Sequence, residues 1–364
     1  MRTRKQMLIA GCFCLLFVLT LIPLHGAYAK DPVVQLKFAN YFPPPAPQSK
    51  ISEEFIAELQ KRTGGTVKVQ FFAGGSLLKA PAMFQGVTTG IADIGYSHVE
   101  YTPGRMPVTE TVGLPLGYPS GWVSNQVAND FVDHFKPPEW KDVEVLYMNA
   151  STPNVMITKK PVRTLEDMKG LTLRAPGRIG DTIKALGATP APTPVMETYD
   201  AMSKGVIDGT YTPFETLKTF RFAEVAKYTT ASWQVGNVYP FYLVMNKNSY
   251  KKLSPGQKKI FDELCGEFKE RSALMWNGVD FDGLDFALQQ KVEIIELTPE
   301  QVDRWIEATK PVMDDYVKKM ASSGYSESEV KGWLSYIQDR IKYWTAKQIA
   351  LHIKSPTGPK GMTP

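Results

Sequence analysis

The segment GLTLRAPGR (170–178) places an arginine at the end of a short strand pattern. Apolar and polar residues alternate up to Arg174, and Pro176 with Gly177 then break the strand. A guanidinium is permanently charged and matches a carboxylate or a sulfonate with two parallel hydrogen bonds. Strand ends are also where α/β sheets bind ligands. Arg174 is therefore a candidate anion-binding residue, with an ordinary surface ion pair as the alternative.

The rest of the sequence contains no familiar catalytic or metal-binding motif. There is no His-Glu-x-x-His or Cys-x-x-Cys pair, no Gly-x-Ser-x-Gly elbow and no glycine-rich nucleotide-binding loop. Pairs of catalytic carboxylates leave little local trace, so these absences do not exclude an enzyme. They favour binding over catalysis, and we expect no enzymatic activity, no metal and no cofactor.

The first 29 residues have the features of a secretory signal peptide. Three basic residues precede an uncharged run from Met7 to Leu24, and the small residues Ala27 and Ala29 fit a cleavage site. We therefore expect export to the periplasm and cleavage after Ala29. A lipoprotein signal ending at Cys12 and an uncleaved membrane anchor are the alternatives.

The composition is that of a soluble globular protein. Of 364 residues, 43% are hydrophobic and 22% are charged. Cleavage after Ala29 would remove three of the 42 basic residues and none of the 37 acidic ones, so the mature chain is close to neutral. It would also leave Cys265 as the sole cysteine, which rules out an intrachain disulfide. Because no clustered basic stripe is present, we expect no nucleic-acid partner. We also expect the protein to be a monomer.

Strand and helix patterns alternate through the first two thirds of the chain. Helices are expected from about residue 48 and over residues 80–89, and strands over residues 33–40, 66–72, 92–97, 143–149, 154–158, 171–176 and 206–211. This alternation predicts mostly parallel sheets with crossover helices.

Two segments, residues 84–96 and 199–211, share one pattern. Each has a helix that ends at a glycine, followed by an aspartate three residues later and then by a tyrosine. The pattern predicts two similarly built lobes with a cleft that closes by hinge motion, and convergent turn chemistry is the alternative.

The last third of the chain is predicted to be helical. Ser254 and Pro255 form a good helix start, and no further proline occurs before Gln290, so this run is one helix or two. A single helix would be about 54 Å long and would cross both lobes. A strand over residues 292–297 and two more helices follow.

Five segments resemble the DctP-type substrate-binding subunit of tripartite ATP-independent periplasmic (TRAP) transporters. They are QLKFAN, GIADIGY, TLEDMKGLTLRAPG, ALGATPAPTPVMETYDAMSKGVIDG and FYLVMNKNSYKKLSPGQKKIF, in order between about residues 33 and 320. The resemblance implies the α/β fold of two-lobe periplasmic binding proteins, with two mixed sheets, crossover strands and a long helix spanning both lobes. It also implies that the lobes close on a small organic anion, which is delivered to the small and large integral membrane subunits.

On this resemblance, the chain divides into two lobes that are each built from separate stretches of sequence. We expect lobe 1 to comprise residues 30–151 and about 240–281, and lobe 2 to comprise residues 152–239 and about 282–350. Residues 351–364 form a C-terminal tail.

The resemblance assigns Arg174 to the family's carboxylate grip. Asn154 stands where sialic-acid binders of the family have a second arginine, which argues against a bulky sugar acid or a dicarboxylate. Thr212 stands where the family often has a ligand-contacting asparagine. Glu215 follows as a second polar contact, with a surface carboxylate as the alternative.

Three further residues are expected at the pocket. Tyr41 and His98 occupy pocket positions of the first lobe in the family, and Trp233 would form an apolar wall. For His98 and Trp233, core packing is the alternative. The expected ligand is a 2-oxo or 2-hydroxy acid, or a small sulfonate such as isethionate. The alternative functions are an exported hydrolase or lyase acting on small organic acids, and a sensor-coupled binder or structural envelope protein.

Overall fold

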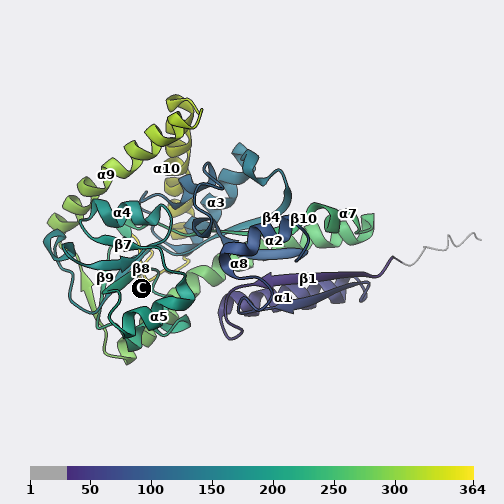
Figure 1. Cartoon of the computed structure of the whole chain (residues 1–364), viewed down its shortest axis with the longest axis horizontal. Coiled ribbons are helices and arrows are strands. Elements are labelled where there is room, and N and C mark those ends of the chain that lie inside the picture. Colours follow the sequence, from purple (N-terminus) through teal and green to yellow (C-terminus); the bar gives the residue numbers. More distant parts are fainter. Residues whose placement is uncertain (1–30) are drawn as a thin grey trace, which may run out of the picture. The chain divides into compact units, whose positions relative to one another are not determined.

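The computed structural model describes residues 31–364, so the expected signal peptide and its cleavage after Ala29 lie outside the described residues. Two separate sheets are formed by these residues (Figure 1), and their strand orders are β2-β1-β3-β10-β4 and β11-β9-β5-β8-β6-β7. The five-stranded sheet consists of β1 (Val34–Asn40), β2 (Val67–Phe72), β3 (Ile94–His98), β4 (Val143–Ala150) and β10 (Pro240–Asn246). The six-stranded sheet consists of β5 (Val155–Thr158), β6 (Thr172–Arg174), β7 (Thr189–Ala191), β8 (Gly209–Thr212), β9 (Tyr228–Ala231) and β11 (Glu293–Glu296).

Both sheets are mixed, which confirms the expected two-lobe α/β architecture. In the first sheet β1 is parallel to β2 and β3, while β10 is antiparallel to β3 and β4. In the second sheet β6 is parallel to β7 and β8, while β5 is antiparallel to β8 and β9. The chain leaves the first sheet after β4, returns with β10 and crosses again to β11. The central strands β3, β10, β5 and β8 are buried throughout, so the core follows the middle of each sheet.

Helices cover the sheets and connect their strands. They are α1 (Pro47–Arg62), α2 (Met83–Thr88), α3 (Gly121–Phe135), α4 (Ile179–Ala185), α5 (Val195–Ser203), α6 (Thr216–Thr219), α7 (Lys247–Lys251), α8 (Pro255–Gln289), α9 (Pro299–Ser322) and α10 (Glu327–Ala350). Among residues 31–364, no helix combines the length and the apolar character that crossing a membrane would require.

The repeated sequence pattern corresponds to the same turn in each sheet. Gly90 and Gly205 follow the ends of α2 and α5 with φ of +79° and +74°, the left-handed conformation that closes a helix. Asp93 then accepts a backbone hydrogen bond from β1 at 2.7 Å, and Asp208 accepts one from β6 at 2.8 Å. In both cases the aspartate ties the turn before a strand to the neighbouring parallel strand. The two crossover units are therefore built alike.

Helix α8 is a single helix of 35 residues, which at about 1.5 Å per residue is about 52 Å long. It begins with a capping box in which Ser254 and Gln257 bind each other's backbone N–H groups. The helix packs against α1, α3 and β4, and also against α6 and β11. It therefore contacts elements around both sheets, as expected (Figure 1).

The last two helices pack on different parts of the molecule. Helix α9 contacts α4 and the 3-10 turn Trp233–Val235, whereas α10 packs on α3. Asp130 of α3 accepts hydrogen bonds from Arg340 and Trp344 of α10, both at 2.6 Å. The expected boundaries place α10 in the second lobe, whereas it packs on α3, which is expected in the first, as well as on α9. The division into two lobes that move against each other stays a prediction.

Candidate ligand-binding site

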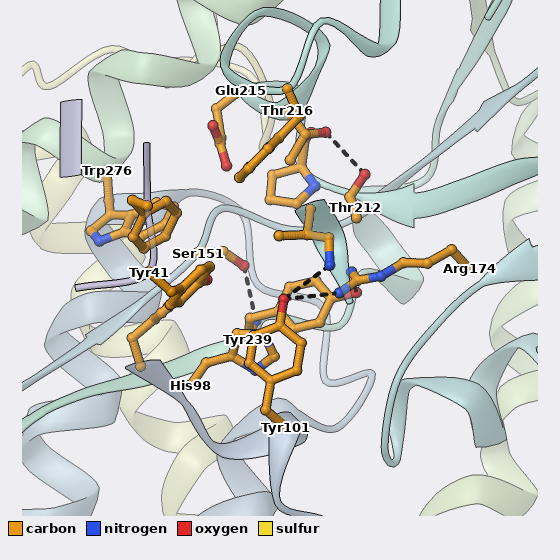
Figure 2. Close-up of a pocket in the computed structure, with 15 residues that line it drawn as sticks. Tyr41, His98, Tyr101, Ser151, Arg174, Thr212, Glu215, Thr216, Tyr239 and Trp276 are labelled. Carbon is orange, nitrogen blue, oxygen red and sulfur yellow. Dashed lines mark hydrogen bonds between the residues drawn. The ribbon is translucent and has the colours of Figure 1, made fainter. Parts of the chain in front are cut away.

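A small cavity lies where the ends of strands from both sheets meet (Figure 2). Strands β6 and β8 supply residues from the six-stranded sheet, and β3 and β10 supply residues from the five-stranded sheet. The aromatic and imidazole rings of the lining are those of Tyr41, Phe42, His98, Tyr101, Phe220, Tyr239, Phe241 and Trp276. The other lining residues are Ser151, Arg174, Val195, Thr212, Pro213, Glu215 and Thr216.

Arg174 ends β6, and its side chain reaches into this cavity while only 1% exposed (Figure 2). Its Nε atom donates a hydrogen bond to the carbonyl oxygen of Thr193 at 2.8 Å. Its two terminal nitrogens donate to the hydroxyl groups of Tyr239 at 3.0 Å and Tyr101 at 3.4 Å. All three of these partners are uncharged.

The guanidinium of Arg174 is therefore buried without a protein counter-charge among the groups that it contacts. A guanidinium has five N–H donors, and these three bonds leave two for a ligand. The ring of Tyr239 lies 5.5 Å from the guanidinium carbon and gives only partial electrostatic support. Because burying a charge is costly unless it is paired, these two free N–H groups are suited to binding an anion.

Aromatic rings surround the guanidinium on the side of the five-stranded sheet. His98, the last residue of β3, lies with its ring centroid 3.7 Å from that of Tyr101 and 5.1 Å from that of Tyr239. Burial and the neighbouring Arg174 hold the pKa of His98 well below its ordinary value, so the imidazole is neutral. Tyr41 meets Tyr101 edge to face at 5.5 Å. These rings form a neutral, flat-sided wall next to a single positive charge.

Apart from Ser151, which follows β4, the remaining polar side chains of the lining come from the end of β8 and the start of α6. The hydroxyl groups of Thr212 and Thr216 lie 3.0 Å apart and share a hydrogen bond. Glu215 is only 3% exposed, and burial raises the pKa of its carboxyl group to about 8. Five of the expected site residues, Arg174, Tyr41, His98, Thr212 and Glu215, are thus brought to one cavity.

The structure does not bring Asn154 or Trp233 to the cavity lining. Asn154 lies in the buried connection between β4 and β5, where its backbone N–H donates to the carbonyl of Asn237 at 2.9 Å. Trp233 is half-buried in a turn that packs on α9. The indole at the cavity belongs to Trp276 of α8 instead, and its N–H donates to the hydroxyl of Tyr96 at 3.1 Å.

The partners of Arg174 were not expected from the sequence. Tyr101 follows His98 by three residues and Tyr239 directly precedes β10, so closeness to a strand end was the available signal. Trp276 is a buried residue in the middle of a long helix and carries no local signal of its role. Within residues 31–364, no group of three or more histidine, cysteine, aspartate and glutamate side chains could hold a metal ion.

A second buried arginine, Arg178, lies in an ionic cluster outside the cavity lining. Its Nε donates to the carboxylate of Glu110, and its backbone N–H donates to Glu100 at 2.8 Å. Burial and the nearby Glu110 raise the pKa of Glu100 to about 8. Gly177 packs so closely here that a Cβ atom would lie 2.0 Å from a carboxylate oxygen of Glu100. The cluster ties the turn after β6 to the segment after β3.

Comparisons with known proteins match this architecture. The family described as bacterial extracellular solute-binding protein, family 7 (DctP) matches residues 38–320. The structure of a TRAP periplasmic solute-binding protein from Desulfovibrio salexigens is 34% identical in sequence, with a TM-score of 0.75 over 85% of this chain and 97% of that chain. It is an open complex with the C-terminus of a symmetry mate in the ligand-binding site.

Two further relatives differ in what they bind. A TRAP solute-binding protein from an unidentified marine microbe, specific for aromatic acid ligands and solved with metahydroxyphenylacetate, is 28% identical. Its TM-score is 0.80, covering 85% of this chain and 99% of that chain. The C4-dicarboxylate-binding periplasmic protein DctP of Rhodobacter capsulatus is 24% identical over 303 residues, which are 80% of this chain and 89% of the relative.

Proposed function

Because this chain belongs to the bacterial extracellular solute-binding protein family 7 (DctP), we propose that it binds a small organic anion through Arg174 and delivers it to the membrane subunits of a TRAP transporter. One observation carries the assignment of the site. Arg174 is a buried cation with two unused N–H donors, it faces a cavity, and its protein partners there are uncharged. The chain is a binding protein of this family and not an enzyme.

The cavity lining favours an anion with a flat apolar body over a smaller anion that lacks one. Ligand sites are mostly apolar, with a few polar groups that orient the ligand, and aromatic rings pack well against other rings. The rings of Tyr41, Tyr101, Tyr239 and Trp276 supply such surfaces beside Arg174. We therefore place aromatic monocarboxylates first among the candidates, which agrees with the aromatic acid specificity of the marine relative.

The smaller acids expected from the sequence remain candidates of second rank. A 2-oxo acid, a 2-hydroxy acid or a sulfonate such as isethionate would satisfy the two N–H donors of Arg174 equally well. Each would leave more of the aromatic wall without a partner. Export to the periplasm with cleavage after Ala29 is part of the same proposal, as is a monomeric state.

A thermal-shift screen on the exported protein tests this function. The candidates are benzoate, hydroxybenzoates, phenylacetate, mandelate, pyruvate, lactate and isethionate. A ligand at a hundredfold excess over its dissociation constant should stabilise the protein by about 2.7 kcal/mol. Each compound that binds should also be recovered unchanged, because the alternative of an exported hydrolase or lyase requires turnover. Conversion of the compound, or no shift with any of these anions, would overturn the proposal.

A further inference from the structure

The cavity has a second polar end, on the side away from Arg174. Figure 2 shows the carboxyl group of Glu215 on the same side of the pocket as Trp276, separated from the guanidinium. The Oε2 atom of Glu215 is buried and has no hydrogen-bond partner within residues 31–364. The backbone N–H of Glu215 donates to Oδ1 of Asp280 at 2.9 Å, so the residue is held in place.

A second unpartnered polar group lies beside this carboxyl. Gln48, near the start of α1, is completely buried, and in the described part of the chain neither its amide oxygen nor its amide nitrogen has a well-formed hydrogen bond. It is close enough to Glu215 to lower the pKa of the carboxyl, although burial outweighs this effect and raises the pKa to about 8. Buried polar groups are nearly always hydrogen-bonded, so the unpaired Oε2 of Glu215 at the cavity indicates a missing partner. Gln48 is not itself part of the cavity lining.

We propose that Glu215 binds a hydroxyl group carried by the ligand's ring, while Arg174 binds the ligand's carboxylate. This inference rests on the proposed function and names its substrate class as hydroxy-substituted aromatic acids. A hydroxyl group donates one hydrogen bond and accepts others, and a protonated carboxyl group likewise both donates and accepts.

Charge favours a neutral hydroxyl over an ammonium group at this end. Asp280 is a buried titratable group next to Glu215, and burial raises its pKa to about 7. With a pKa of about 8 the carboxyl group of Glu215 is largely protonated near neutral pH. No basic residue lies in the cavity lining apart from Arg174 and the neutral His98. A site of this kind recognises a hydrogen-bonding group without requiring a charge.

Titration calorimetry with four acids tests the inference on the exported protein. The acids are benzoate, 3-hydroxybenzoate, 4-hydroxybenzoate and 3-(aminomethyl)benzoate. At least one hydroxybenzoate should bind about tenfold more tightly than benzoate, because a site with unpaired buried polar groups discriminates against a ligand that cannot pair them. The ammonium-bearing acid should bind more weakly than the best hydroxybenzoate.

Variants then assign the preference to these residues. In Glu215→Met the ratio of hydroxybenzoate to benzoate affinity should fall to within about twofold of one, whereas Glu215→Gln should keep most of it because the amide still donates and accepts. Glu197→Met, which removes an exposed carboxylate on α5, is the matched control and should leave the ratio unchanged. If Glu215→Met does not fold, the smaller change Glu215→Ala provides the same comparison.

Three results would overturn the hydroxyl site and leave the anion-binding function standing. They are an equal affinity for benzoate and both hydroxybenzoates, a preference for the ammonium-bearing acid, and a ratio that survives when Glu215 is replaced by Met or Ala. Binding of lactate, pyruvate or isethionate without any aromatic acid would have the same effect. If none of these anions binds at all, the proposed function fails together with the hydroxyl site.

Discussion

Arg174 and Arg178 lie four residues apart in the same turn, and both are buried, at 1% and 8% exposure. Their partners differ in kind. Arg178 is paired with the carboxylate of Glu110 next to Glu100, whereas Arg174 contacts only hydroxyl groups and a carbonyl. An arginine whose charge is already paired within the protein stabilises the fold. One left with neutral partners in a cavity is available for the charge of a ligand.

The two arginines are also coupled through the turn that joins them. The Arg178 cluster attaches this turn to Glu100, which directly precedes Tyr101, one of the partners of Arg174. The position of the anion site therefore depends on the ionic cluster next to it. A variant of Arg174 removes the group proposed to bind the anion, whereas a variant of Arg178 disturbs the cluster that positions it. Comparing the two separates these effects.

The largest effect is expected from Arg174→Ala, measured as ligand affinity by calorimetry. Truncating one member of a buried charged pair costs about 2–5 kcal/mol, which corresponds to a loss of about 30-fold to several thousandfold in affinity. Arg174→Lys should restore only part of this, because an ammonium keeps the charge but not the planar fork.

The ligand-free protein is the control for this variant. Unfolding of Arg174→Ala in urea should show unchanged or slightly higher stability, since a buried charge without a counter-charge has been removed. Affinity within threefold of the unmodified protein would return Arg174 to the role of a structural residue.

Arg178→Ala should instead lower the stability of the fold by about 3–5 kcal/mol, because it leaves the carboxylate of Glu110 buried without its partner. The measurement is the free energy of unfolding in urea without ligand. The double variant Arg178→Met with Glu110→Leu should recover much of this loss, since both charges are then absent. A loss below about 1 kcal/mol would show that the cluster behaves as an exposed ion pair.

Gly177→Ala tests the contact between the turn and Glu100. The left-handed φ of +56° costs a non-glycine residue about 1–2 kcal/mol, and the added Cβ would also lie 2.0 Å from the Glu100 carboxylate. Gly205→Ala is the matched control, because its φ is +74° and a Cβ there would meet nothing within 4 Å. Urea unfolding should show a larger loss for Gly177→Ala, and ligand affinity should fall for that variant alone. Equal losses in both variants would mean that the turn does not depend on this contact.

The last test concerns the dependence of stability on pH. Burial raises the pKa of Glu100 from an ordinary value of 4.5 to about 8, so the folded protein holds a proton that the unfolded chain has released. The contribution of Glu100 to the free energy of unfolding is fully present below about pH 4.5. It is lost as the pH rises toward 8, and above that pH the free energy of unfolding no longer changes because of this group. Thermal unfolding between pH 5 and 9 should show this decline, and Glu100→Gln should flatten part of it. An identical slope in Glu100→Gln would exclude Glu100 as its source.

Local chemistry accounts for what could be predicted. Alternating apolar residues predicted the strands that end near Arg174 and His98, because the period of a strand is written in consecutive residues. The left-handed glycines at 90 and 205 followed from helix ends, which are also local. The family resemblance further indicated Tyr41, Thr212 and Glu215, and the structure places these residues around one cavity.

Which side chains meet across that cavity was decided by the tertiary structure. Tyr239 approaches Arg174 because β10 returns to the first sheet beside β3, and Trp276 reaches the lining because α8 crosses both sheets. Trp233 had the more suggestive sequence context, but its turn packs on α9. Glu110 and Arg178 are 68 residues apart and become a buried pair only when the two segments pack together. Such contacts depend on how sheets and helices are stacked, and no pattern within a single element of secondary structure contains that information.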